Sequence, residues 1–292
     1  MWFRGRLRQG KPSETAQRVA AHRLMFERVA APYGDPQSDV RLASDVASGV
    51  APSTGRMHEY LRARTAFFDR AVVNALERGM SQVVVGAAGY DGRAYRYAKP
   101  GVVWFELDHP STQADKLARL ARRGVQTGHV RFVPADFASD PVAERLLGAG
   151  LDPRSPSLFL LEGVAVYLQL AVLQRLLRQL RQVAHEGSRL AMSVSFAVGD
   201  PVARARFQAA VAAMGEPARS TLEPDEAADL MSQAGWELLA SDPFETAGGA
   251  GPAAVTTSGD STPAEEKTRQ ERQRRAGFLV ATAAGDISRD QS

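Results

Sequence analysis

One stretch, residues 82–110, constrains the fold more than any other part of the chain. It reads QVVVGAAGYDGRAYRYAKPGVVWFELDHP. Residues 83–85 are three consecutive valines, and such a β-branched apolar run is typical of a strand buried on both faces of a parallel sheet. Three glycines follow within seven residues: Gly86, Gly89 and Gly92. A second apolar run, residues 102–105, then ends in Glu106 and Asp108. This order of strand, glycine turn, crossover, strand and acid predicts an α/β fold.

The same stretch predicts a site for a ligand that carries a nucleoside. Ligands of such sheets bind outside the carboxyl ends of the strands, and glycines let backbone N–H groups approach them closely. Glu106 and Asp108 lie 17 and 19 residues after Gly89, about the offset at which an acid accepts the hydroxyls of a ribose. The glycines are spaced G-x-x-G-x-x-G rather than G-x-G-x-x-G, so a dinucleotide cofactor fits less well. Glycine turns of this kind also occur in α/β proteins without a nucleoside ligand.

The rest of the chain alternates between further strands and amphipathic helices. Strands are expected at residues 130–133, 157–161, 189–196, 236–239 and 277–282. Helices are expected from Ser13 up to the Pro32-Gly34-Pro36 region, and at 53–79, 111–123, 170–180 and 224–234. In the helix over 111–123, Leu117 and Leu120 are expected to face the core. The pattern predicts a Rossmann-like seven-stranded sheet with helices on both faces, whose last strand inserts antiparallel as half of a terminal hairpin.

The segments group into one structural domain with two parts. Residues 1–79 form an N-terminal tail and a helical cap or lid, and residues 80–292 form the core. A stretch rich in Gly, Ala, Ser, Thr and Pro, residues 247–270, reads as a flexible loop. Because segments added before the first strand face the sheet tips in such folds, the helices over 13–79 are expected to cover the ligand site.

Several classes of protein are disfavoured by what the chain lacks. It has no apolar run of about 18 residues, and its basic N-terminus has no apolar segment, so neither a transmembrane helix nor a secretory signal is expected. The absence of cysteine excludes disulfides and thiolate zinc sites and fits a cytoplasmic protein. Basic clusters at residues 4–11 and 272–275 read as solvated termini, so we expect neither a nucleic-acid nor a membrane partner. No metal-ligand cluster is found.

Five ordered motifs resemble those of the leucine carboxyl methyltransferase-like family of class I S-adenosylmethionine (SAM)-dependent methyltransferases. They are RARTAFFD at 62–69, GAAGYDGRAYR at 86–96, ELDHP at 106–110, PADF at 134–137 and EGVAVYL at 162–168. The likeness covers roughly residues 55–200. It implies a Rossmann-like fold and SAM as the cofactor.

The resemblance also implies roles for individual residues. Arg64 looks like the partner of the methionine carboxylate, and Glu162 like an acceptor near the methionine ammonium. Asp108 looks like the ribose acid, ahead of Glu106. The turn under the methionine part and the adenine contacts would comprise Gly86, Ala88, Gly89, Asp91, Asp136 and Phe137. From the residues alone, Asp136 could equally cap the following helix.

One position departs from the family pattern. Where family members commonly read G-A-G, this chain reads Ala87-Ala88-Gly89. An alanine at position 87 is tolerable if its φ is negative, but costs about 1–2 kcal/mol if its φ is positive. Weak or unusual SAM binding is therefore an expectation to test.

The leading functional hypothesis is a SAM-dependent O-methyltransferase acting by in-line displacement on a carboxylate of a small molecule or peptide. Such an acceptor, with a pKa near 4, is ionised at neutral pH and needs no general base. A phenol hydroxyl would need one, and His58 and His109 are the candidates, although a surface or capping role fits each of them as well. The alternatives are methylation of a phenol or amine of a natural product, a nicotinamide-dependent oxidoreductase, and a non-catalytic SAM-binding protein. The acceptor's identity and the oligomeric state are left open.

Overall fold

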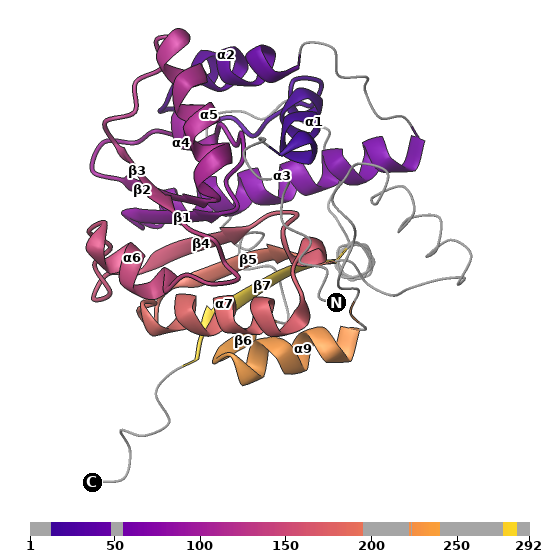
Figure 1. The fold of residues 1–292 in the computed structure, drawn as a ribbon, viewed down its shortest axis with the longest axis vertical. Coiled ribbons are helices and arrows are strands. Elements are labelled where there is room, and N and C mark those ends of the chain that lie inside the picture. The colour runs from indigo at the N-terminus through magenta and orange to yellow at the C-terminus, as the bar shows by residue number, and fades with distance from the viewer. Residues whose placement is uncertain (1–12, 48–54, 195–221, 223, 240–276, 285–292) are drawn as a thin grey trace, which may run out of the picture.

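A single seven-stranded sheet runs through the middle of the computed structural model, which describes residues 13–47, 55–194, 222, 224–239 and 277–284 (Figure 1). The strand order is β3-β2-β1-β4-β5-β7-β6. The strands are β1 (Gln82–Gly86), β2 (Val103–Asp108), β3 (Val130–Pro134), β4 (Ser157–Leu161), β5 (Arg189–Ser193), β6 (Trp236–Leu238) and β7 (Phe278–Ala283). The predicted Rossmann-like fold is confirmed.

The pairing of the strands determines where a ligand can bind. Strands β1 to β5 pair in parallel, and β7 lies antiparallel between β5 and β6, as the sequence predicts. Strand β1 has β2 on one side and β4 on the other, so the strand order reverses between β1 and β4. In open α/β sheets the crevice at such a switch point is the usual ligand site. The carboxyl ends of β1 and β4 carry Gly86 and, one residue beyond β4, Glu162.

Helices cover both faces of this sheet (Figure 1). On one face lie α1 (Glu14–Arg23), α2 (Pro36–Val46), α3 (Gly55–Glu77), α4 (Arg93–Arg96) and α5 (Pro110–Arg122). On the other lie α6 (Val142–Gly148), α7 (Leu170–Gln182) and α9 (Pro224–Gln233), with the short 3₁₀ turn η1 (Ala165–Tyr167) before α7. Side chains along β1 alternate between the two faces of the sheet. Val83 and Val85 pack in the core of the first face, and Val84 packs in that of the second.

The N-terminal segment differs from its prediction. Ser13 caps α1 as expected, accepting a hydrogen bond from the Ala16 N–H at 3.1 Å, but the helix ends at Arg23, well before the prolines. A second helix, α2, was missed. Its N-cap is Asp35, whose side chain accepts from Gln37 N, and Pro36 occupies its first turn, where a proline is tolerated. Pro36, predicted to end the first helix, therefore begins the second.

A further correction concerns α5. Leu120 is buried as expected, but Leu117 is 40% exposed and does not face the core. Gln113 and Lys116 are buried instead, because they pack towards polar groups of β2. The loop expected at 247–270, the two basic clusters and the end of the strand expected over 189–196 lie outside the described residues. Within the described part of the chain, every helix is too short or too polar to span a bilayer.

Candidate functional site

The acid at the tip of β2 faces the glycine turn rather than solvent. One oxygen of the half-buried Asp108 carboxylate accepts a hydrogen bond from His109 N at 2.6 Å, and the other accepts from Gly89 N. Burial raises the pKa of Asp108, while these two N–H groups oppose the rise. A carboxylate has about four lone-pair sites, so Asp108 can accept two further hydrogen bonds.

The glycine turn is packed closely on both sides. A Cβ on Gly86 would lie 2.5 Å from Leu161 Cδ2, and one on Gly89 would lie 2.8 Å from the Ala16 Cβ of α1. The departure noted at position 87 has a structural consequence, since Ala87 has a φ of +53°. It is the one non-glycine residue with positive φ among the described residues. Holding alanine in this left-handed region costs about 1–2 kcal/mol.

Glu162 and Arg64, predicted to bind the two ends of the methionine part, contact each other directly. Arg64 Nε donates to Glu162 Oε1 at 3.0 Å. The other oxygen, Oε2, accepts from Arg93 at 2.5 Å and pairs with Arg23 at 3.0 Å. Burial opposes ionisation of Glu162, but the guanidinium groups of Arg23, Arg93 and Arg64 outweigh it and lower the pKa to about 2. Glu162 is therefore a carboxylate at all physiological pH values.

Asp91 fixes the far side of the turn. Its side chain accepts from the backbone N–H of Arg93 at 2.8 Å, and it pairs with the side chains of Arg93 at 2.6 Å and Arg23 at 3.3 Å. Burial works against its ionisation, yet the neighbouring guanidinium groups lower its pKa. The N-terminal helix α1 thus reaches two predicted site residues through Arg23.

These contacts belong to a larger buried network that sequence reasoning did not find. Among the described residues it joins five arginines (Arg23, Arg28, Arg64, Arg93, Arg96) to four carboxylates (Asp39, Asp69, Asp91, Glu162). The partners come from α1, the α1–α2 connection, α2, α3, the glycine turn, α4 and the end of β4. The signal available in the sequence was weak: Ala16, Ala20 and Arg23 share one face of α1, so an arginine ends an otherwise apolar stripe.

The two acids of the ELDHP motif have different environments. Glu106 lies in the interior, 1% exposed, where it pairs with Lys116 at 2.6 Å. Burial raises the pKa of Glu106 to about 7, with Lys116 opposing the rise. Asp108 rather than Glu106 is therefore the acid at the strand tip.

Asp136 and Phe137 follow β3. Asp136 is exposed, and its carboxylate accepts from Ala138 N at 2.9 Å in a turn that precedes α6. Phe137 is buried, and its ring lies 3.9 Å from the position of a Cβ on Gly86. The ring thus borders the glycine turn, while the adenine contacts themselves stay a prediction.

Of the two candidate histidines, His109 has the capping role that the sequence allowed. His109 caps α5, accepting from Ser111 N at 3.3 Å, and His58 makes an edge contact with the Phe26 ring at 5.1 Å. The histidine that sequence reasoning passed over is His22, which is 3% exposed on α1. Burial lowers its pKa, as do the nearby charges of His58, Arg18 and Arg64. His22 is thus a neutral imidazole among cations.

Comparison with known proteins identifies the family. A sequence model described as leucine carboxyl methyltransferase matches residues 16–181, which is more than half of the chain. The chain belongs to the leucine carboxyl methyltransferase family. The match includes the five motifs that carried the resemblance and all of α1 except its first two residues.

Proteins with similar sequences are found in mycobacteria. A protein of Mycobacterium avium (strain 104), provisionally described as an S-adenosyl-L-methionine-dependent methyltransferase, is 38% identical over 170 residues. That alignment covers 57% of this chain and 53% of the relative. A protein of Mycobacterium sp. (strain JLS) with the same description is 39% identical over 148 residues, 50% of this chain and 48% of its own. The alignments thus span about half the length of these relatives.

Two solved structures share the fold of this family member. One is a provisionally described methyltransferase from Thermobifida fusca YX, with a TM-score of 0.57 and 16% identity over 96% of this chain and 97% of the other. The second is a DUF574 family protein from Streptomyces avermitilis MA-4680, with a TM-score of 0.54 and 17% identity over 95% of this chain and 99% of the other. At these identities the comparison concerns the fold alone.

Proposed function

We propose that the protein is a SAM-dependent O-methyltransferase that methylates a carboxylate of a small molecule or peptide. One observation carries the proposal: the Asp108 carboxylate is turned onto the Gly89 N–H at the same sheet edge where Arg64 and Glu162 meet. An acid, a close backbone approach and a cation–carboxylate pair are the groups that a ribose and a zwitterionic amino acid require. Family membership and the mycobacterial relatives support the same reading.

The residues present fit the cofactor. Asp108 keeps two acceptor positions for the ribose hydroxyls. Arg64 uses Nε for Glu162 and carries further N–H donors for a carboxylate, and Gly163 beside it has a φ of +66° and no side chain. The terminal nitrogens of Arg64 lie 3.0 and 3.5 Å from where a Cβ on Gly163 would stand, so a side chain there would crowd them. Among the described residues, Glu162 Oε1 accepts a hydrogen bond from Arg64, and it can accept from an ammonium group as well.

The chain's own contribution to the reaction would be orientation. When bound, SAM supplies an electrophilic methyl group on a sulfonium sulfur. An acceptor carboxylate is already ionised at neutral pH, so no side chain has to remove a proton. Glu162 holds its charge because Arg23, Arg93 and Arg64 surround it, and Arg64 holds its own beside Glu162. Correct orientation of two reactants can lower a barrier by about 7–11 kcal/mol.

Calorimetric titration of the full chain with SAM and its demethylated product tests the proposal. We expect micromolar binding that weakens at least tenfold in Asp108→Asn, a loss of about 1.4 kcal/mol or more. The matched control is Asp152→Asn, because Asp152 lies before β4 at the opposite edge of the sheet and pairs with exposed Arg154. Absence of heat with either ligand would refute the cofactor assignment. Binding without a methylated acceptor of any kind in any extract would refute the enzymatic assignment.

A second acceptor class is favoured by His22. This imidazole is buried and kept neutral among Arg18, Arg64 and His58, so it could take a proton from a phenol hydroxyl. If the acceptor is a phenol, wild-type activity should fall at acid pH as His22 gains a proton. His22→Gln should then lower the activity and remove this acidic limb. If the acceptor is a carboxylate, His22→Gln should leave the pH profile unchanged.

A further inference from the structure

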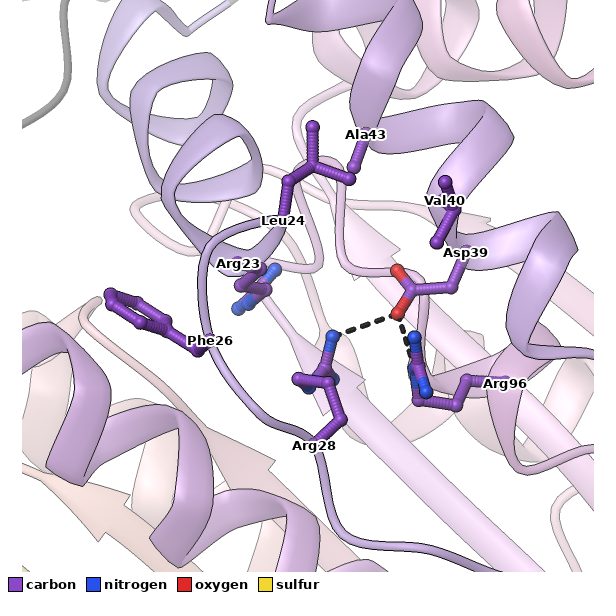
Figure 2. A pocket seen from close by; sticks show the side chains of 8 residues that line it. All are labelled: Arg23, Leu24, Phe26, Arg28, Asp39, Val40, Ala43 and Arg96. Carbon is purple, nitrogen blue, oxygen red and sulfur yellow. Dashed lines mark hydrogen bonds and ion pairs between the residues drawn. The ribbon is translucent and has the colours of Figure 1, made fainter.

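A small pocket lies between the end of α1, the α1–α2 connection, α2 and α4 (Figure 2). Its volume is about 260 Å³ including the open space at its mouth. The residues that line it are Arg23, Leu24, Phe26, Arg28, Asp39, Val40, Ala43 and Arg96. Half of them are charged and half are apolar, so the pocket combines a polar end with an apolar wall.

The polar end carries more positive than negative charge. Figure 2 shows Arg28 and Arg96 converging on the Asp39 carboxylate, to which they donate at 2.7 and 2.6 Å. Arg23, the third arginine of the pocket, is 7% exposed, and its Nε has no hydrogen-bond partner among the residues that the structure describes. A buried guanidinium N–H without a partner is costly, and an acceptor in the pocket would remove that cost.

The count of charges over the whole network points the same way. Its five arginines and four carboxylates, taken over the described residues, leave one positive charge unmatched. Uncompensated charge in a buried position is unfavourable. An occupant with a single negative charge would balance the network.

The pocket adjoins the glycine turn. Asp39 Oδ1 lies 1.9 Å from where a Cβ on Gly92 would stand, so the pocket's carboxylate rests against that turn. Arg23 links the two places, because the same guanidinium that lines the pocket pairs with Asp91 and Glu162. An occupant of the pocket would therefore be one side chain away from the residues predicted to bind the cofactor.

We propose that this pocket is a binding site for a small aliphatic carboxylate, a short-chain acid of a few carbons. Its carboxylate would accept from Arg23 Nε and from the arginines around Asp39, and its alkyl part would lie against Leu24, Phe26, Val40 and Ala43. The apolar wall favours a carboxylate with a carbon chain over inorganic phosphate, whose surface is polar all round. The carboxylate could belong to a free metabolite or to the acceptor.

Thermal unfolding of the full chain in increasing butyrate, at constant ionic strength, tests the site without any cofactor. We expect a saturable rise in Tm with a midpoint in the millimolar range, because a ligand that binds the folded state stabilises it. In Arg96→Gln the midpoint should shift at least tenfold upwards. Arg41→Gln is the matched control, since Arg41 also lies on this side of the cap but pairs with Asp35 in an exposed position. Its response should equal that of the wild type.

A second variant keeps the test decisive if Arg96→Gln does not fold. Val40→Met lengthens a half-buried side chain of the pocket wall and leaves all charges in place, and it should abolish the butyrate response. An identical response in wild type, Arg96→Gln and Val40→Met would show general anion stabilisation and overturn the site. An equal response to inorganic phosphate would overturn the carboxylate assignment.

Adding SAM to the butyrate-saturated protein separates the two sources of the carboxylate. Methyl butyrate in the mixture would identify the pocket's occupant as part of the acceptor. A butyrate-dependent rise in Tm without any methyl ester would identify it as a separate ligand. The Tm measurements decide whether the site exists, and they need no cofactor, so failure of methyl transfer refutes only the acceptor role and not the site.

Discussion

The helices on the two faces of the sheet bury different kinds of side chain. On the face of α6, α7 and α9, the buried side chains of the helices are apolar, and the leucines of α7 at positions 173, 176, 177 and 180 are each at most 1% exposed. On the face of α1 to α5, the interior holds charged groups as well. Asp69, Arg93, Glu106 and Lys116 are at most 1% exposed there.

The apolar face and the charged face contribute differently to stability and to function. Burying an apolar side chain stabilises a fold by roughly 1.5–3 kcal/mol, whereas a buried ion pair is often no better than apolar residues of the same size. The apolar face therefore supplies the scaffold. The charged face holds groups that stability alone does not require, and its network ties α1 and α2 to the edge of the sheet where the cofactor is proposed to bind.

Arg93→Met should give the largest effect, a loss of about 3–5 kcal/mol in the free energy of unfolding. Arg93 is fully buried and pairs with Asp69, Asp91 and Glu162, so its removal leaves three carboxylates with too few partners. Denaturant unfolding measures the loss. Leu177→Ala on the apolar face, expected to cost about 2–5 kcal/mol, is the comparison.

The pH dependence distinguishes these two losses. Within the folded protein the pKa of Asp69 and that of Glu162 are both about 2, below their usual values of 3.8 and 4.5. Groups with depressed pKa values stabilise the fold above their unfolded pKa and lose that contribution as the pH falls towards the folded one. The deficit of Arg93→Met should therefore shrink below about pH 4.5, while that of Leu177→Ala should not. Equal deficits at every pH would contradict the distinction between the faces.

Glu106→Gln should have a smaller effect that appears in the opposite pH range. Burial raises the pKa of Glu106 from 4.5 to about 7, so the folded state binds a proton that the unfolded state has lost. Wild-type stability should then fall between about pH 4.5 and 7, by up to about 3 kcal/mol, and stay level above. Glu106→Gln should flatten this slope. Asp136→Asn, at an exposed position, is the control that should keep it.

Much of the fold was predictable because its signals are local. Each strand is a short apolar run, and an unbroken run such as residues 157–161 suits only a strand covered on both faces. A ligand site at the carboxyl ends of the strands was predicted from the order of strand, glycine turn, strand and acid, and the residues of that site from the resemblance in the motifs. Arg64 and Glu162, 98 residues apart in sequence, contact each other, while the roles that the resemblance gave them towards the cofactor stay a prediction.

The buried network was not predictable for the opposite reason. Arg28 lies in a connection without periodicity and pairs with Asp69, 41 residues further along. An arginine in a helix or loop usually reaches water, so its spacing gives no sign of burial. The helix α2 was missed because Pro36 was interpreted as a terminator, although a proline at the first turn can begin a helix. Long-range charge pairing and the two meanings of proline are decided by tertiary structure.

The smallest effect should come from Ala87→Gly, at the one place where the backbone of the glycine turn is strained. Relief of a positive φ gains about 1–2 kcal/mol, and the extra flexibility of glycine in the unfolded chain returns part of it, so the net gain should be up to about 1 kcal/mol. Ala88→Gly is the matched control, because Ala88 is not among the residues with positive φ and should lose about 0.5–1 kcal/mol. Urea unfolding of the wild type and these two variants measures both changes.

Ala87→Val, with a β-branched side chain at a left-handed position, should be destabilised relative to the wild type. If Ala87→Gly were destabilising like the other two substitutions, alanine at position 87 would not be strained. The charged face would then not carry this energetic cost.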